Sequence, residues 1–228
     1  MNRFRHVLLF SAVLLLFAAC DRGVPMATNP DQLPAPESAQ VATFGGGCFW
    51  CVEEVFHQTA GVYSAVSGYM GGRAETANYE TVGRGRTNHA EVVQVHFDPE
   101  VIPYDELLDV FFLLHDPTQL NRQGPDRGRQ YRSVIFAHND LQKLAAIESI
   151  RRMNEERKFG RDVLTALADA PEFYPAESYH QNFARSNPGN GYLRSHLYPK
   201  LRKFEMLVPG GSKGVADDVD VKGSHPRR

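Results

Sequence analysis

The chain has 228 residues, with 25 Lys and Arg against 27 Asp and Glu, and 42% of its residues are hydrophobic. This is enough apolar material for one domain with a hydrophobic core, and a net charge of −2 gives no reason to expect a nucleic-acid partner. Three cysteines are too few for a disulfide-stapled scaffold, so each cysteine needs its own explanation.

The first residues are typical of a signal peptide, which we expect over residues 1–19. Arg3 and Arg5 precede an apolar run, residues 7–19, that is shorter than the roughly 20 residues needed to span a bilayer. The run ends at Cys20, and this junction resembles a bacterial lipoprotein box, in which the peptide is cut before a cysteine that becomes lipidated. An ordinary cleavage site with an incidental cysteine is the alternative. Asp21 resembles an inner-membrane retention signal, so we expect the protein in the cell envelope, anchored at Cys20 on the extracytoplasmic or periplasmic face.

Two further segments have the composition of unstructured chain. Residues 20–40 contain four prolines among small and polar residues, and we expect an extended tether there. Residues 209–228 combine glycines with an acidic run and show no amphipathic pattern, which predicts a disordered tail. The folded domain is therefore expected over residues 41–208.

Hydrophobic periodicity within the domain alternates between the strand and the helix repeat. We expect strands at residues 41–44, 91–97, 133–137 and 163–168, and helices at residues 49–58, 105–115 and 139–159. On the last helix we expect four apolar residues to face the core: Leu141, Leu144, Ile147 and Ile150. This order predicts the α/β class, a mixed sheet with helices packed on it.

A glycine run joins the first expected strand to the first expected helix. Gly45, Gly46 and Gly47 permit unusual backbone angles, and Cys48 follows at the start of the helix. Free backbone N–H groups and the helix dipole favour a thiolate at such a position, so we expect a lowered pKa for Cys48. Cys48 is the candidate nucleophile.

Cys51 follows Cys48 by one helical turn, close enough for a disulfide if the first turn opens slightly. A zinc site would need two more ligands, and His57 and His89 do not have the spacing of a ligand pair around the cysteines. We therefore interpret the cysteines as a redox pair and expect no metal. The glycine run matches neither a dinucleotide fingerprint nor a phosphate loop, so no cofactor is expected.

The motif Gly47-Cys48-Phe49-Trp50 resembles the active-site signature of A-type peptide methionine sulfoxide reductases. Further blocks resemble that family in its order, namely Gly68-Tyr69, Asn78-Tyr79, Asn88 to Val92, His115 to Gln119, Arg122 to Asp126, Gln130 to Ser133, Phe173 to Glu177 and His180-Gln181. The resemblance implies a two-layer α/β sandwich with a ferredoxin-like mixed sheet. It also implies reduction of the S epimer of methionine sulfoxide, free or in oxidised proteins and peptides.

The same resemblance implies roles for individual residues. Reducing a sulfoxide needs a nucleophile on sulfur, Cys48, and a proton for the oxygen, which Glu91 would donate; desolvation on an apolar strand would raise its pKa. The residues expected to bind the substrate are Phe49 and Trp50, as the apolar wall for the methyl group, and Tyr79, Asp126 and Tyr131, around the oxygen.

The chain departs from the family pattern in two places. Many members carry a second cysteine after an Asn-Pro…Gly-Tyr stretch, but here Tyr192 is followed by Leu193. With Cys20 assigned to the lipid, any thiol of the mature monomer that resolves the Cys48 sulfenic acid must be Cys51. Phe183 stands where many relatives have a tyrosine, and we expect this to alter binding more than chemistry.

The disulfide would be reduced by thioredoxin or, outside the cytoplasm, by a thioredoxin-like dithiol protein. We expect a monomer. Two alternatives remain open: a general thiol–disulfide oxidoreductase that uses the two cysteines on protein disulfides, and a non-catalytic, lipid-anchored module that binds metal through them.

Overall fold

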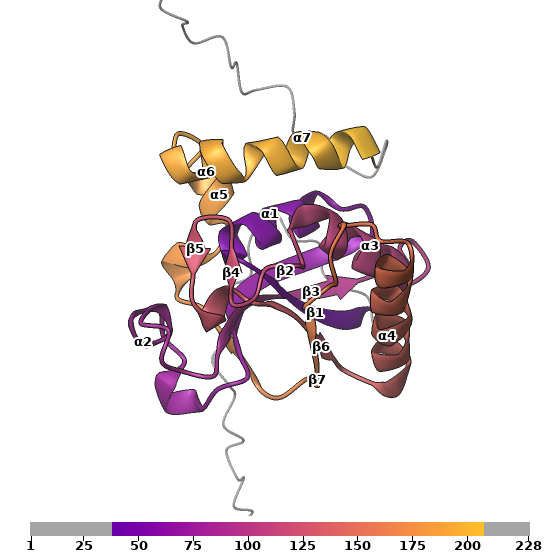
Figure 1. Ribbon diagram of the computed structural model, residues 1–228. Helices are drawn as coiled ribbons and strands as arrows, with labels where there is room; N and C mark the ends of the chain where they lie inside the picture. Colours follow the sequence, from indigo (N-terminus) through magenta and orange to yellow (C-terminus); the bar gives the residue numbers. More distant parts are fainter. Residues whose placement is uncertain (1–37, 208–228) are drawn as a thin grey trace, which may run out of the picture. The chain divides into compact units, whose positions relative to one another are not determined.

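The computed structural model describes residues 38–207, so the expected signal peptide, Cys20, most of the tether and the tail lie outside the described residues. A six-stranded sheet with the order β7-β6-β1-β3-β2-β8 forms the centre of the domain (Figure 1). The strands are β1 Gln40–Gly46, β2 Val62–Met70, β3 Ala90–Phe97, β6 Ser133–Ala137, β7 Ala166–Asp169 and β8 Phe173–Pro175. Neighbours are antiparallel except β6 and β7, which are parallel, so the predicted mixed α/β fold is confirmed.

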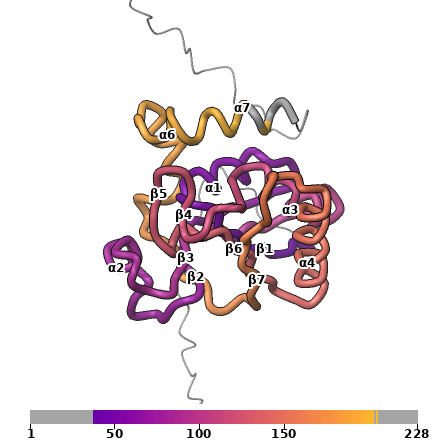
Figure 2. The backbone as a smooth tube through the Cα atoms, in the orientation of Figure 1, coloured from indigo at the N-terminus to yellow at the C-terminus, as the bar shows by residue number. Residues whose placement is uncertain are grey.

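Three helices pack on the sheet: α1 Phe49–Gln58, α3 Tyr104–Leu114 and α4 Asp140–Glu155. The remaining elements are α2 Tyr79–Gly83, α5 Phe183–Ser186, α6 Gly191–His196, α7 Tyr198–Leu207, the short pair β4 Arg122–Gln123 and β5 Asp126–Arg127, and 3-10 turns at Ala74–Thr76, Arg129–Tyr131 and Ser178–His180. The backbone trace shows α6 and α7 lying over α1 (Figure 2). No helix within residues 38–207 is both long and apolar enough to cross a bilayer.

The main hydrophobic core lies between the sheet and these helices. Alternate residues of β3, Val93, Val95 and Phe97, are fully buried there, because successive side chains of a strand point to opposite faces. Phe44 from β1 stacks on Phe111 of α3 with ring centroids 5.1 Å apart. The period-2 pattern thus decides which side chains of β3 face the helices.

Most expected elements are confirmed, and the helix at Phe49–Gln58 has the predicted bounds. The fourth strand starts only at Ala166, because the N–H of Leu164 donates to the Pro117 carbonyl instead of to a neighbouring strand. The long strand β2 was not predicted, since small and polar residues interrupt its apolar positions. It is nevertheless buried over most of its length, because β3 and β8 flank it.

The expected apolar face of α4 is wrong. Leu141, Leu144 and Ile147 are 79%, 62% and 49% exposed, and only Ile150 packs partly against the core. The buried face instead carries Gln142, Ala146, Ser149 and Met153. Gln142 is buried because its side chain donates to the Val41 carbonyl at 2.7 Å and accepts the N–H of His138 at 3.1 Å. A tertiary hydrogen bond therefore determines the rotation of this helix.

Candidate active site

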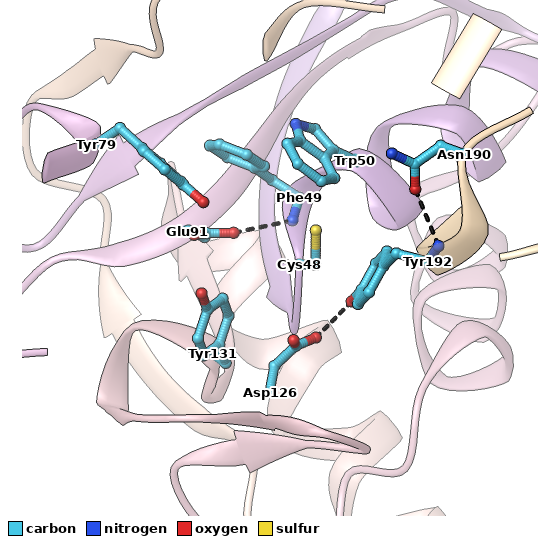
Figure 3. Close-up of a pocket in the computed structure, with 9 residues that line it drawn as sticks. All are labelled: Cys48, Phe49, Trp50, Tyr79, Glu91, Asp126, Tyr131, Asn190 and Tyr192. Carbon is cyan, nitrogen blue, oxygen red and sulfur yellow. Dashed lines mark hydrogen bonds between the residues drawn. The ribbon is translucent and has the colours of Figure 1, made fainter. Parts of the chain in front are cut away.

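A pocket of about 230 Å³ opens where β1 ends and α1 begins. Its lining brings together residues from the whole domain: Cys48, Phe49, Trp50, Tyr79, Glu91, Asp126, Tyr131, Asn190 and Tyr192 (Figure 3). All the residues expected in the site line it except Cys51, which lies buried beneath Cys48 on α1, and Cys20, which lies outside the described residues.

The turn from β1 into α1 requires glycine at two positions. Gly47 has a φ of +100°, and a Cβ added there would lie 2.7 Å from the side chain of Gln123. A Cβ at Gly45 would lie 2.9 Å from the Glu91 carbonyl oxygen. The glycines thus let the chain turn sharply, and they leave Cys48 at the N-cap of α1, as the sequence predicts.

The two cysteines differ in exposure. Cys48 is half-buried at the pocket, whereas Cys51 is 2% exposed, and both are free thiols. Burial, together with the hydrogen bond to Cys51, raises the pKa of the Cys48 thiol well above its ordinary value, although the Trp50 amide opposes the shift. The predicted lowering of this pKa is therefore wrong, because the surrounding protein removes more solvation from a thiolate than the helix terminus replaces.

Glu91 lies on β3 in the same row as the core residues Val93 and Val95, at the end of the strand that meets α1. It is 2% exposed, and its Oε2 accepts the N–H of Phe49 at 3.2 Å. Burial raises the pKa of Glu91 to about 8 against the opposing Phe49 amide, as the sequence predicts. At neutral pH this carboxyl therefore holds a proton at the wall of the pocket.

Two tyrosine hydroxyls point toward the Glu91 carboxyl, one from Tyr79 at the start of α2 and one from Tyr131 in a 3-10 turn (Figure 3). Burial raises the pKa of both, so both are neutral hydrogen-bond donors. Asp126 of β5 lies on the other side of Cys48 and accepts the Tyr192 hydroxyl at 2.5 Å. The pocket therefore has several proton-bearing groups around one sulfur.

An aromatic wall forms the remaining side of the pocket. The indole N–H of Trp50 donates to Nδ1 of His180 at 3.1 Å, which places the imidazole proton on Nε2. The His180 ring packs against Phe49 and Tyr79, with centroids 5.0 and 4.4 Å away. Phe183 stacks on Trp50 with the rings 3.8 Å apart and 12° from parallel. Phe183, which stands where many relatives have a tyrosine, thus supports Trp50 and does not itself line the pocket.

Glu177 fixes the Tyr79 side of this wall. Its Oε1 accepts the Tyr79 N–H at 2.8 Å, and its Oε2 accepts the Tyr69 hydroxyl at 2.9 Å. The turn that contains Glu177 and His180 therefore holds both Tyr79 and Trp50, although these two residues come from different elements.

Sequence reasoning missed two lining residues, Asn190 and Tyr192. The signal in the sequence is the Asn-Pro…Gly-Tyr stretch at residues 187–192, which contains both of them. Asn190 caps α6 by accepting the N–H of Tyr192 at 2.9 Å, and Tyr192 reaches Asp126. Among residues 38–207, no cluster of three or more His, Cys, Asp or Glu is placed to hold a metal ion.

Comparison with known proteins agrees with the site. A family model described as peptide methionine sulfoxide reductase matches residues 40–209. A peptide methionine sulfoxide reductase MsrA from Polynucleobacter asymbioticus is 48% identical over 163 residues, which cover 72% of this chain and 86% of the relative. The Acinetobacter baumannii (strain AYE) protein of the same name is 52% identical over 165 residues, with 72% and 94% coverage.

Solved structures show the same fold. Reduced Mxr1 from Saccharomyces cerevisiae aligns with a TM-score of 0.64 and 34% identity, covering 71% of this chain and 92% of Mxr1. Methionine sulfoxide reductase A of Corynebacterium diphtheriae aligns with a TM-score of 0.64 and 33% identity, covering 68% and 78%. The pocket, the fold and these matches together show that the chain belongs to the peptide methionine sulfoxide reductase A family.

Proposed function

We propose that Cys48 and Glu91 carry out the methionine sulfoxide reduction that this enzyme performs. The observation that carries the proposal is the protonated Glu91 carboxyl, buried at the pocket wall beside the N-terminus of the helix that bears Cys48. Cys48 attacks the sulfoxide sulfur while Glu91 donates a proton to the oxygen, which is a poor leaving group as an anion, and the resulting carboxylate takes up the proton of the Cys48 thiol. The protonated oxygen then passes to the Cys48 sulfur as the bond between the two sulfurs breaks, which leaves a sulfenic acid on Cys48 and releases methionine. Overall, one thiol and one sulfoxide become one sulfenic acid and one thioether, so no proton or electron is left over.

The pocket supports selection of one epimer. Phe49 and Trp50 offer an apolar wall for the methyl group, and Tyr79 and Tyr131 offer hydroxyl donors to the oxygen on another side. The attacking sulfur of Cys48 lies on a third side, so the rest of the bound substrate must extend out through the opening of the pocket. Only one hand of sulfoxide satisfies all these positions, and family resemblance assigns it as S.

Cys51 is proposed as the resolving thiol. It lies one helical turn from Cys48 and hydrogen-bonds to it, and no cysteine follows in the C-terminal part of the chain. Its thiol attacks the Cys48 sulfenic acid, which forms the disulfide and releases water. Thioredoxin or a thioredoxin-like dithiol protein then returns both cysteines to thiols.

The sequence supports an envelope location for the enzyme, with a lipid anchor at Cys20 and the domain carried on the tether. The supporting features are Arg3, Arg5, the apolar run and the lipoprotein-like junction. Labelling of cells with an alkyne fatty acid tests this. The parent protein would be labelled and would sediment with membranes, and Cys20→Ser would be unlabelled. Equal labelling of the two proteins would refute the anchor at Cys20.

The catalytic proposal is tested with the separated S and R epimers of a blocked methionine sulfoxide, using dithiothreitol as donor and Cys48→Ser as control. We expect turnover of the S epimer only, lost in the control. Turnover of the S epimer by Cys48→Ser would refute the nucleophile, and turnover of both epimers would refute the binding arrangement.

Cys51→Ser tests the resolving step separately. This variant would form methionine in a first turnover but would be regenerated more slowly by thioredoxin than the parent. Regeneration at the parent rate would refute the role of Cys51.

A further inference from the structure

We infer that the protein that regenerates this enzyme attacks the sulfur of Cys48, through the same opening that admits methionine sulfoxide. Reductant and substrate then exclude one another at the pocket. The inference rests on the proposed Cys48–Cys51 disulfide and names which of its two sulfurs is attacked.

Cys48 is the more accessible of the two sulfurs. Attack on a disulfide depends on which sulfur an incoming thiolate can reach, and it approaches on the side away from the sulfur that leaves. Cys48 lines the pocket, whereas Cys51 is 2% exposed, does not line it and belongs to the main hydrophobic core. A thiolate in the pocket thus meets Cys48, with Cys51 behind it as the leaving group.

The C-terminal helices close the other route. In this chain the segment that carries a cysteine in many relatives covers α1 with apolar side chains instead, and Leu193 and Leu197 are fully buried in the same core as Cys51. Tyr192 ties this segment to β5 through its hydrogen bond with Asp126. Reaching Cys51 from outside would require α6 to lift, at the cost of exposing both leucines.

The reductant's thiolate forms a bond to the sulfur of Cys48, the Cys48–Cys51 bond breaks, and its electron pair goes to Cys51, which takes up a proton. The reductant's second thiol then attacks the reductant's first sulfur and releases Cys48. The Cys48–Cys51 disulfide gains two electrons and becomes two thiols, and the reductant loses two electrons and is left as a disulfide. The partner is thus a dithiol protein whose cysteine protrudes far enough to enter the pocket that Trp50, Asn190 and Tyr192 help to line.

The first test traps the mixed disulfide. The full chain is oxidised with methionine sulfoxide, and peptide mapping first establishes that the Cys48–Cys51 bond is present. Its absence would refute the proposed resolution by Cys51, and with it this inference. A thioredoxin with its second active-site cysteine changed to serine is then added. The reaction is stopped with acid after successive short times, and free thiols are alkylated. We expect thioredoxin on Cys48 and the alkyl group on Cys51 at the earliest times. Thioredoxin on Cys51 at those times would overturn the inference.

The second test measures competition. The rate at which intact thioredoxin reduces the oxidised enzyme is followed while the reaction product, a blocked methionine, is titrated. If both use one opening, the rate falls about twofold when the product concentration equals its dissociation constant for the oxidised enzyme, and it continues to fall above that. Blocked alanine at the same concentrations is the control. An unchanged rate at saturating blocked methionine would overturn the inference.

Discussion

The buried carboxyl of Glu91 makes this protein less stable as the pH rises, and Glu91→Gln should remove that effect. The substituted amide would be neutral at every pH, and its oxygen would still accept the Phe49 N–H that Glu91 now accepts at 3.2 Å. The change removes the proton donor but preserves the hydrogen bond, so stability and catalysis are expected to move in opposite directions.

The magnitude follows from the shift in pKa. Glu91 titrates at about 8 in the folded protein against an ordinary value of 4.5, so between these values the folded state holds a proton that the unfolded chain has released. The free energy of unfolding therefore falls as pH rises, by about 1.4 kcal/mol per pH unit. Integrated from pH 4.5 to pH 7, the loss is about 3 kcal/mol, which is the most that Glu91→Gln can recover at pH 7.

Urea unfolding of parent and variant between pH 4.5 and pH 8 measures this difference. Glu53, whose pKa burial also raises to about 8, is present in both proteins, so its contribution cancels. The variant should be more stable near neutral pH and similar to the parent near pH 4.5, while turnover falls about 10²- to 10⁴-fold through loss of the acid. A stability difference that does not change with pH would refute the buried-proton argument, and full activity in the variant would refute the acid role.

Three further predictions follow from the packing. Leu144→Ser should change the free energy of unfolding by less than about 0.5 kcal/mol, whereas Leu107→Ala in the core should cost about 2–5 kcal/mol; equal losses in urea titrations would contradict the observed rotation of α4. Gly47→Ala should lower the free energy of unfolding by about 1–3 kcal/mol, because of the positive φ at this position and the contact of the added Cβ with Gln123. Gly83→Ala, with open space around the added Cβ, should not destabilise the protein; an unchanged free energy of unfolding in Gly47→Ala would refute the strained turn. His180→Phe should shift the emission of the chain's single tryptophan and raise KM more than it lowers kcat, and His180→Asn, which keeps an acceptor, should shift it less; identical spectra for all three proteins would refute the hydrogen bond.

Local pattern was sufficient for the part of the site that is contiguous in the sequence. A strand, a glycine run and an amphipathic helix follow one another between residues 40 and 58, and each depends mainly on its own residues. The position of Cys48 at the helix start was therefore predictable. Conversely, β2 and the rotation of α4 were not, because neighbouring strands bury the first and the hydrogen bond from Gln142 to Val41 sets the second.

By itself, then, the sequence determined the family, the nucleophile and the residue types of the pocket, since these are carried by motifs read along the chain. Only the tertiary structure decided the protonation of the site and the relative access of its two sulfurs. The reason is physical, because the solvation of a thiol or a carboxyl depends on everything packed around it. The Glu91 carboxyl is packed against Phe49, which lies 42 residues earlier in the chain, and Cys51 is covered by the C-terminal helices. Burial keeps a proton on Glu91 and raises the pKa of Cys48, and no pattern within a single element specifies either effect.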